Sequence, residues 1–299
     1  MNGWSLFWLL SVPISLSVIL HGLQTDLSTG EGVSEMIGYS VRWAVPFIYL
    51  VIAASAVQIL FPSPLSMWLL RNRKYLGLVF AVAMAWQGLG IFVVSTFMRD
   101  YYFAEIYAFR DELEGTIGYV FLGALTITSF KIGSRFVTAD QWKLIHKAGV
   151  IFLWAYPFSV YWWNLFYYPY LDGYSAPRLI DYLFYAGGFA AFGLRLTAWG
   201  KMRLMKSAKE APGVSPTPVA RAGGGALIVV GLAAAVSGQL WYNGVANILA
   251  GPAWSAETSL WLPFWPLEPF LPLLTIGLGI MIATTVQTAN KAATEAVPS

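Results

Sequence analysis

The sequence contains no cysteine, only two histidines and few charged residues, which make up 11% of its 299 positions. The absence of cysteine excludes disulfide bonds, thiolate metal sites, iron–sulfur clusters and thiol catalysis. Two histidines without cysteine are also a poor ligand set for a transition metal, and we expect no protein-only metal site. Soluble domains carry roughly 25% charged residues, so the shortage of charge points away from a soluble protein.

Hydrophobic residues are abundant instead, at 58% of the chain, with a mean hydropathy of +0.61. The apolar runs are continuous and lack period-two alternation, which predicts helices rather than the strands of a barrel. The net charge of +3 comes from residues at helix ends, so it is no signal for nucleic-acid binding. The triplet 223–225 has neither a preceding strand nor GxGxxG spacing, and we therefore expect no nucleotide cofactor.

A helix needs about 20 apolar residues to cross the hydrocarbon core of a bilayer. The N-terminus, MNGWSLFWLL, lacks the positive residues of a cleavable signal peptide, so we take it as the first span. The predicted spans are 4–22, 41–61, 75–98, 115–132, 144–168, 179–200, 224–250 and 267–287. The fold class expected is thus an all-α integral membrane protein, a polytopic bundle of about eight transmembrane helices.

The distribution of charge predicts the orientation of this bundle. If the N-terminus is placed inside, 14 of the 18 basic residues fall on inner connections, and 12 of the 15 acidic residues fall on outer ones. Lysine and arginine favour the cytoplasmic side of membrane proteins. We therefore expect both termini to be cytoplasmic, in the inner (cytoplasmic) membrane of a bacterium.

The connections between spans have distinct compositions. Residues 99–114 place Tyr102, Ile106 and Phe109 at helical spacing among acidic residues, which predicts a short amphipathic helix on the outer surface. Residues 251–266 hold three tryptophans and three prolines and are expected at the outer headgroup level.

Four segments follow from this organisation. Residues 1–200 form a six-helix membrane domain, and residues 201–222 form a cytoplasmic linker. Residues 223–290 form an additional C-terminal transmembrane pair with the outer interfacial loop. Residues 291–299 are a tail.

The middles of the spans hold almost no ionisable groups, apart from Arg195, which lies close enough to the inner end to reach the interface. Ion-coupled carriers bury carboxylates or histidines along their path, so we do not expect a pump. Polar uncharged residues at mid-span are expected to form hydrogen bonds between helices, worth about 0.6–2 kcal/mol each. They are Gln87, Ser159, Gln239 and Asn247.

Residues 141–170 attract attention because they contain His146 near a basic end and finish in a band of aromatic residues. We interpret this stretch as a spanning helix that enters from the positive side, with the aromatic band anchoring it at the outer interface. Whether His146 holds a cofactor is the main question that the sequence raises.

Two segments together resemble the ferric-reductase-like transmembrane superfamily, which includes NADPH oxidase membrane domains and the haem-binding membrane partner of bacterial methionine-sulfoxide reductase. Residues 68–92 contain a basic turn, Leu-Gly-Leu and a helix, similar to the family helix that carries a haem-ligating histidine. Residues 142–146, ending in His146, are similar to the family's Trp-x-x-Leu-His, and residues 118–134 look like its fourth helix. The resemblance covers the first six spans and implies a six-helix core, haem b and electron transfer.

The chain departs from the ligand pattern of this family. Ten residues after Gly77, where the resemblance implies a haem histidine, stands Gln87. Thirteen residues after His146, where it implies a second, stands Ser159. Glutamine and serine are poor haem-iron ligands. If haem is present, the residues expected to bind it are His146 and, one turn before Gln87, Met84. His21 lies at the opposite end of the bundle and is not expected to share an iron with His146.

The first hypothesis is an integral membrane structural or accessory subunit of a larger electron-transfer or energy-converting complex. It would be built on a ferric-reductase-like scaffold that has lost its bis-histidine haem site, and it would have no catalytic activity of its own. The alternative is a b-type haem or quinone-linked electron-transfer protein fed by a partner reductase. A transporter of neutral or lipidic substrates is a third hypothesis. The expected partners are the lipid bilayer and other membrane subunits, while a bound lipid, quinone or pigment stays open.

Overall fold

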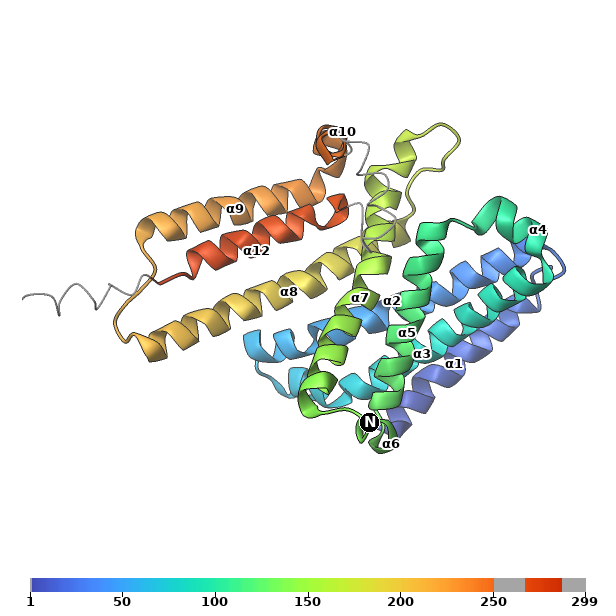
Figure 1. The fold of residues 1–299 in the computed structure, drawn as a ribbon, viewed down its shortest axis with the longest axis horizontal. Coiled ribbons are helices and arrows are strands. Elements are labelled where there is room, and N and C mark those ends of the chain that lie inside the picture. Colours follow the sequence, from blue (N-terminus) through green and yellow to red (C-terminus); the bar gives the residue numbers. More distant parts are fainter. Residues whose placement is uncertain (1, 250–266, 287–299) are drawn as a thin grey trace, which may run out of the picture.

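The computed structural model describes residues 2–249 and 267–286, and within these ranges the secondary structure is helical, without strands. The elements are α1 (Trp4–Gly22), α2 (Gly30–Leu60), α3 (Pro64–Phe97), α4 (Arg99–Tyr101), the π-helix η1 (Tyr102–Ile106), α5 (Phe109–Thr128), α6 (Lys131–Ser134), α7 (Ala139–Phe166), the 3₁₀-helix η2 (Tyr168–Tyr170), α8 (Leu179–Glu210), α9 (Pro218–Val236), α10 (Gly238–Leu249), the 3₁₀-helix η3 (Glu268–Phe270) and α12 (Leu271–Ala283). Figure 1 shows α8, α9 and α12 side by side in one half of the molecule and α1, α3 and α5 in the other.

Five of the described helices, α1, α2, α3, α8 and α9, are long and apolar enough to cross a membrane. This confirms the prediction of an all-α membrane protein, whereas the count of eight spans is not confirmed. Helix α7 has 28 residues and would be about 42 Å long. Its tryptophans, tyrosines and Asn164 lower its hydropathy, although its length exceeds the roughly 30 Å of a hydrocarbon core.

Helix α2 lies at the centre of the fold and packs on α3, α7 and α8. Its inner face is apolar and closely packed, with Ile52 and Ala54 fully buried. Two bonds join α2 to α8. The Arg195 guanidinium donates to the carbonyl of Ile52 at 3.3 Å, and the Lys201 ammonium donates to the carbonyl of Ile59 at 2.7 Å.

Helix caps extend α2 and α3 beyond the predicted spans. The Thr29 hydroxyl accepts from the amide of Gly32, so α2 begins at Gly30 instead of residue 41. Ser63 and Ser66 form a capping box before α3, with Pro64 in its first turn, so that α3 begins 11 residues before the predicted span. A hydropathy window detects only the apolar part of such helices.

The aromatic residues of α7 form the core of the bundle rather than an interfacial anchor alone. Phe158 and Trp162 are fully buried, and the Trp154 indole donates to the carbonyl of Gly188 on α8 at 3.0 Å. A Cβ on Gly188 would lie 2.8 Å from the Tyr49 ring, so glycine permits this close approach of α8. Trp162 is therefore packed inside the bundle and has no exposed surface with which to contact lipid.

The C-terminal helices differ from the predicted pair. The predicted span 224–250 is divided at Ser237 into α9 and α10, because Ser237 leaves the helical conformation. Helix α12 has 13 residues, about 20 Å, which is shorter than a hydrocarbon core. It packs closely on α9, where the backbones of Gly224 and Gly279 meet.

Two connections also differ from expectation. Helix α8 continues to Glu210, so the non-helical connection between α8 and α9 is 211–217 instead of the whole of 201–222. The predicted surface helix over 99–114 is replaced by α4 and η1, and Phe109 already belongs to α5 because the chain becomes extended at Tyr107 and Ala108. The predicted interfacial loop 251–266 and the tail 291–299 lie outside the described residues.

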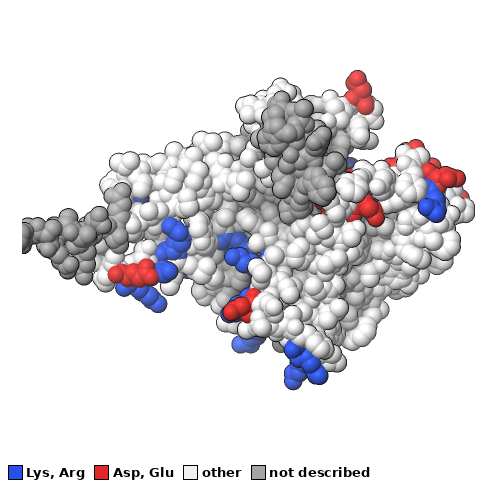
Figure 2. All heavy atoms as spheres, viewed as in Figure 1, with Lys and Arg blue, Asp and Glu red and all other residues white. Residues whose placement is uncertain are grey.

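Figure 2 shows the charges separated along the molecule, with most lysines and arginines towards one end of the bundle and most aspartates and glutamates towards the other. The end of α2 and the starts of α3 and α7 lie at the basic end, and α8 extends beyond the end of α2. His146 and the cavity described below lie close to this end.

Candidate functional site around His146

The start of α7 positions His146. Thr138 and Gln141 form a capping box: the Thr138 hydroxyl accepts from the Gln141 amide, and the Gln141 side chain accepts from the Thr138 amide. Residues four apart in a helix share one face. Accordingly, the indole of Trp142 stacks on the imidazole of His146, with ring centroids 4.0 Å apart.

Thr128, at the end of α5, is the hydrogen-bonding partner of this pair. Its hydroxyl oxygen lies 3.0 Å from Nε2 of His146, and its carbonyl accepts from the Trp142 indole at 3.1 Å. The same hydroxyl donates its single hydrogen to the carbonyl of Ala124 at 2.6 Å. The hydroxyl must therefore act as acceptor towards His146, which assigns the imidazole hydrogen to Nε2. This nitrogen has no lone pair available for a metal.

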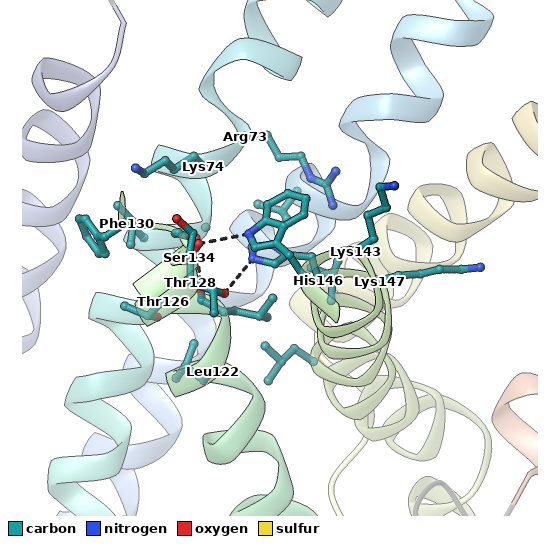
Figure 3. A pocket seen from close by; sticks show the side chains of 18 of the residues that line it. Arg73, Lys74, Leu122, Thr126, Thr128, Phe130, Ser134, Lys143, His146 and Lys147 are labelled. Atoms are coloured by element: carbon teal, nitrogen blue, oxygen red, sulfur yellow. Dashed lines mark hydrogen bonds between the residues drawn. The ribbon is translucent and has the colours of Figure 1, made fainter. Parts of the chain in front are cut away.

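These side chains form one wall of an open cavity of about 1050 Å³, which residues of α2, α3, α5, α6, α7 and α8 line (Figure 3). Its deeper part is apolar and includes Ile48, Val51, Leu78, Val150 and Leu153. The volume is that of a site for a small molecule or part of a lipid.

Six basic residues line the cavity, and the described lining contains no aspartate or glutamate. The basic residues are Arg73, Lys74, Lys131, Lys143, Lys147 and Arg195. The four lysines are exposed, whereas the two arginines are half-buried. Lys143 forms an ion pair with Asp140 at 3.2 Å, and Lys74 lies over the ring of Phe130.

The two arginines approach from different helices, Arg73 from α3 and Arg195 from α8. Figure 3 shows Arg73 reaching towards His146. Its side chain has no hydrogen-bonding or ion-pair partner among the described residues, and its positive charge is repelled by that of Arg195. Among the described residues, Arg195 donates to the backbone carbonyl of Ile52 alone. The cavity thus contains two guanidinium groups without a described protein anion.

The structure does not bring the other predicted haem residues to His146. The Tyr119 hydroxyl donates to the carbonyl of Met84 and to the side-chain oxygen of Gln87. Tyr119 and Thr128 are nine positions apart on α5, or roughly 13 Å along the helix axis. Met84 and Gln87 therefore lie at a different depth in the bundle from His146.

Ser159 and His21 are also engaged elsewhere. The Ser159 hydroxyl donates to the carbonyl of Tyr156 within its own helix at 2.8 Å. The imidazole of His21 stacks on Tyr39 and lies 3.2 Å from the Glu35 carboxylate.

This set of residues does not form the bis-histidine haem site that the resemblance implies. Nε2 of His146 is bonded to Thr128, and the positions that correspond to family ligands make hydrogen bonds within α3, α5 and α7. The described residues also contain no group of three or more histidine, cysteine, aspartate or glutamate side chains able to hold a metal. Comparison with family models, curated proteins and solved structures finds no match to this chain.

Sequence reasoning identified His146 but missed Thr128 and Arg73 as parts of its surroundings. Arg195 gave a signal, because it stood out as the charged residue deepest in a predicted span. Arg73 was counted only among the basic residues of a connection. The pairing of these two arginines, 122 positions apart, depends on the packing of α3 and α8 against α2.

Proposed function

We propose that this protein is a structural or accessory subunit of a larger membrane complex of electron-transfer or energy-converting type. Its first six spans, residues 1–200, would form a ferric-reductase-like scaffold that does not hold a bis-histidine haem, and residues 223–290 would add a transmembrane pair. The eight-span bundle would lie in a bacterial inner membrane with both termini in the cytoplasm. The separation of charge in Figure 2 supports this orientation.

The observation that carries the proposal is the bonding of His146. Its Nε2 donates to Thr128 and its ring stacks on Trp142, so the imidazole acts as part of the helix packing. Gln87, at a position that the resemblance gives to a haem ligand, is likewise bonded to Tyr119. A frame that keeps the helices but uses these positions for packing suits a subunit that supports other proteins.

The alternative is a b-type haem or quinone-linked electron-transfer protein fed by a partner reductase. One observation favours it: His146 lines a large cavity with an apolar interior, which a flat or extended apolar cofactor could enter. Haem ligation through Nε2 would require the His146–Thr128 hydrogen bond to break, whereas ligation through Nδ1 would leave it in place.

Gentle solubilisation of the native membrane tests the two functions together. We expect the protein to co-purify with other membrane subunits and to show no Soret band or reduced-minus-oxidised haem bands. A stoichiometric b-type spectrum that disappears in His146→Ala would overturn the accessory proposal in favour of the alternative. Recovery as a monomer without partners would also overturn it.

Two further variants would identify the ligands of any haem that is bound. Met84→Leu removes the second predicted haem ligand, and Gln87→Leu removes the polar group at the position that the resemblance gives to a haem histidine; neither adds a new ligand. A haem signal that is lost in Met84→Leu as well as in His146→Ala would identify a His–Met pair. We expect the wild type and both variants to give the same spectrum, without haem bands.

A further inference from the structure

We propose that the cavity beside His146 binds the phosphate group of an anionic phospholipid through the guanidinium groups of Arg73 and Arg195. This inference goes beyond an accessory role and does not depend on which complex the protein joins. It rests on the charge, the lining and the position of the cavity.

The positive charge in the cavity lining is unbalanced. Arg73 and Arg195 are half-buried, repel each other and have no carboxylate in the described lining of the cavity. Arg195 has a single bond to a neutral carbonyl, that of Ile52. Charges removed from water are stable when an opposite charge pairs with them. An anion between α3 and α8 would satisfy both groups.

The chemistry of the two arginine side chains suits a phosphate group. A guanidinium is planar and presents its N–H donors as a fork that matches the oxygens of a phosphate. Two such forks on separate helices can bind one phosphate from two sides. The hydroxyl of Ser55 in the lining adds a donor of a kind that phosphate oxygens also accept, whereas the hydroxyl of Ser129 already donates to the carbonyl of Leu125.

The apolar part of the lining identifies the phosphate as part of a lipid. The cavity is also lined by Ile48, Val51 and Leu153, which suit a hydrocarbon chain better than a free ion or a nucleotide. Beside the lining residue Lys131, the side chain of Ile132 is 70% exposed, and Phe136 nearby is 79% exposed. Such exposed apolar side chains next to a basic cavity suit contact with acyl chains.

The lysines have a different part in this site. In Figure 3, Lys143 and Lys147 extend from α7 on the side away from Thr128. Lys143 is already paired with Asp140, and both lysines are exposed. Basic residues at the membrane surface attract anionic lipids. We therefore assign lipid attraction to the lysines at the rim and phosphate binding to the two arginines.

Lipid retention in a defined mixture tests the proposal. The full-length protein is purified in detergent, equilibrated with equal amounts of phosphatidylglycerol and phosphatidylcholine, and examined by native mass spectrometry. We expect phosphatidylglycerol to be retained at least about tenfold over phosphatidylcholine. The double variant Arg73→Gln, Arg195→Gln should lose this preference, and Arg73→Gln alone should weaken it.

Arg71→Gln is the matched control, because Arg71 lies on the same helix, is exposed and is not among the residues that line the cavity. It should retain phosphatidylglycerol as the wild type does. A thermal melt without added lipid guards against misfolding. Removing one of two repelling charges should leave the melting midpoint unchanged or raise it, while the increase on adding phosphatidylglycerol is lost.

The outcomes separate the possible ligands. Equal retention of the two lipids by the wild type overturns the proposal, as does equal loss of phosphatidylglycerol in Arg71→Gln. Stabilisation by inorganic phosphate alone, as strong as that by phosphatidylglycerol, would overturn the lipid in favour of a soluble phosphate compound. A visible spectrum of the same sample reports haem independently, so a failure of the proposed function is recognised separately from a failure of lipid binding.

Discussion

The hydroxyl of Thr128 joins α5 to α7 by accepting a hydrogen bond from Nε2 of His146 at a distance of 3.0 Å. It can do so because its own hydrogen is donated to the carbonyl of Ala124. His146 is thereby held in one orientation, stacked on Trp142. Substitutions can test this bond and the contacts that hold the helices together.

Thr128→Val should destabilise the protein by about 1 kcal/mol, because side-chain hydrogen bonds in membrane proteins are worth roughly that much. Unfolding in mixed micelles measures the change. Thr128→Ser keeps the hydroxyl and should have a smaller effect. In a His146→Ala background the cost of Thr128→Val should shrink, since the partner is already gone. An equal cost in both backgrounds would contradict the bond.

Gly188→Ala should destabilise the bundle by about 1–3 kcal/mol, the usual cost of overpacking. The new methyl group would lie 2.8 Å from the Tyr49 ring and 3.0 Å from that of Phe158, both of which are buried. Gly193→Ala on the same helix is the control, because a Cβ there has no neighbour within 4 Å. Thermal unfolding of the two variants should differ clearly, and similar midpoints would refute the close packing of α8.

Gly224→Ala should separate α9 from α12. A Cβ on Gly224 would collide with the carbonyl oxygen of Gly279 and lie 2.6 Å from the amide nitrogen of Ala283. Backbone atoms cannot turn aside as side chains do, so we expect a loss of at least about 1–3 kcal/mol. Gly225→Ala, next in sequence and free of neighbours within 4 Å, should be tolerated. Limited proteolysis of the C-terminal region is a suitable measurement.

Tyr102 should make the stability depend on alkaline pH. Burial, followed by the hydrogen bond that its hydroxyl donates to Glu112, raises the pKa of Tyr102 to about 12. An unfolded tyrosine ionises near pH 10. Between about pH 10 and 12 the folded state therefore holds more protons than the unfolded state, and stability falls as pH rises.

Unfolding midpoints from pH 8 to 11.5 test this dependence, with Tyr102→Phe as the comparison. The variant removes the ionising group, so the part of the alkaline decline that belongs to Tyr102 should disappear. An identical decline in the variant would assign the effect to other tyrosines.

The sequence was sufficient for the class of fold, because long continuous apolar runs allow only membrane helices. Gly188, Gly231 and Gly238 lie against neighbouring atoms that leave no room for a side chain. Helix ends were less predictable. Capping by Thr29 and Ser63 extends helices through polar residues, and the break at Ser237 interrupts an apolar run that hydropathy reads as continuous.

The site was only partly predictable for a similar reason. The scarcity of histidine drew attention to His146, and its neighbour Trp142 follows from helical spacing. Thr128 belongs to another helix, and nothing in its local sequence indicates that its hydroxyl is directed at an imidazole. The arginine pair likewise depends on which helices α2 brings together.

The two bonds between α2 and α8 limit how these helices can move. Ile52 and Ile59 are about 10.5 Å apart along α2, and Arg195 and Lys201 are about 9 Å apart along α8, so the two contacts match in spacing. A displacement of α8 by one turn, about 5.4 Å, would break both at once. The two contacts fix the axial position of α8 relative to α2. Sliding of α8 along α2 is therefore disfavoured.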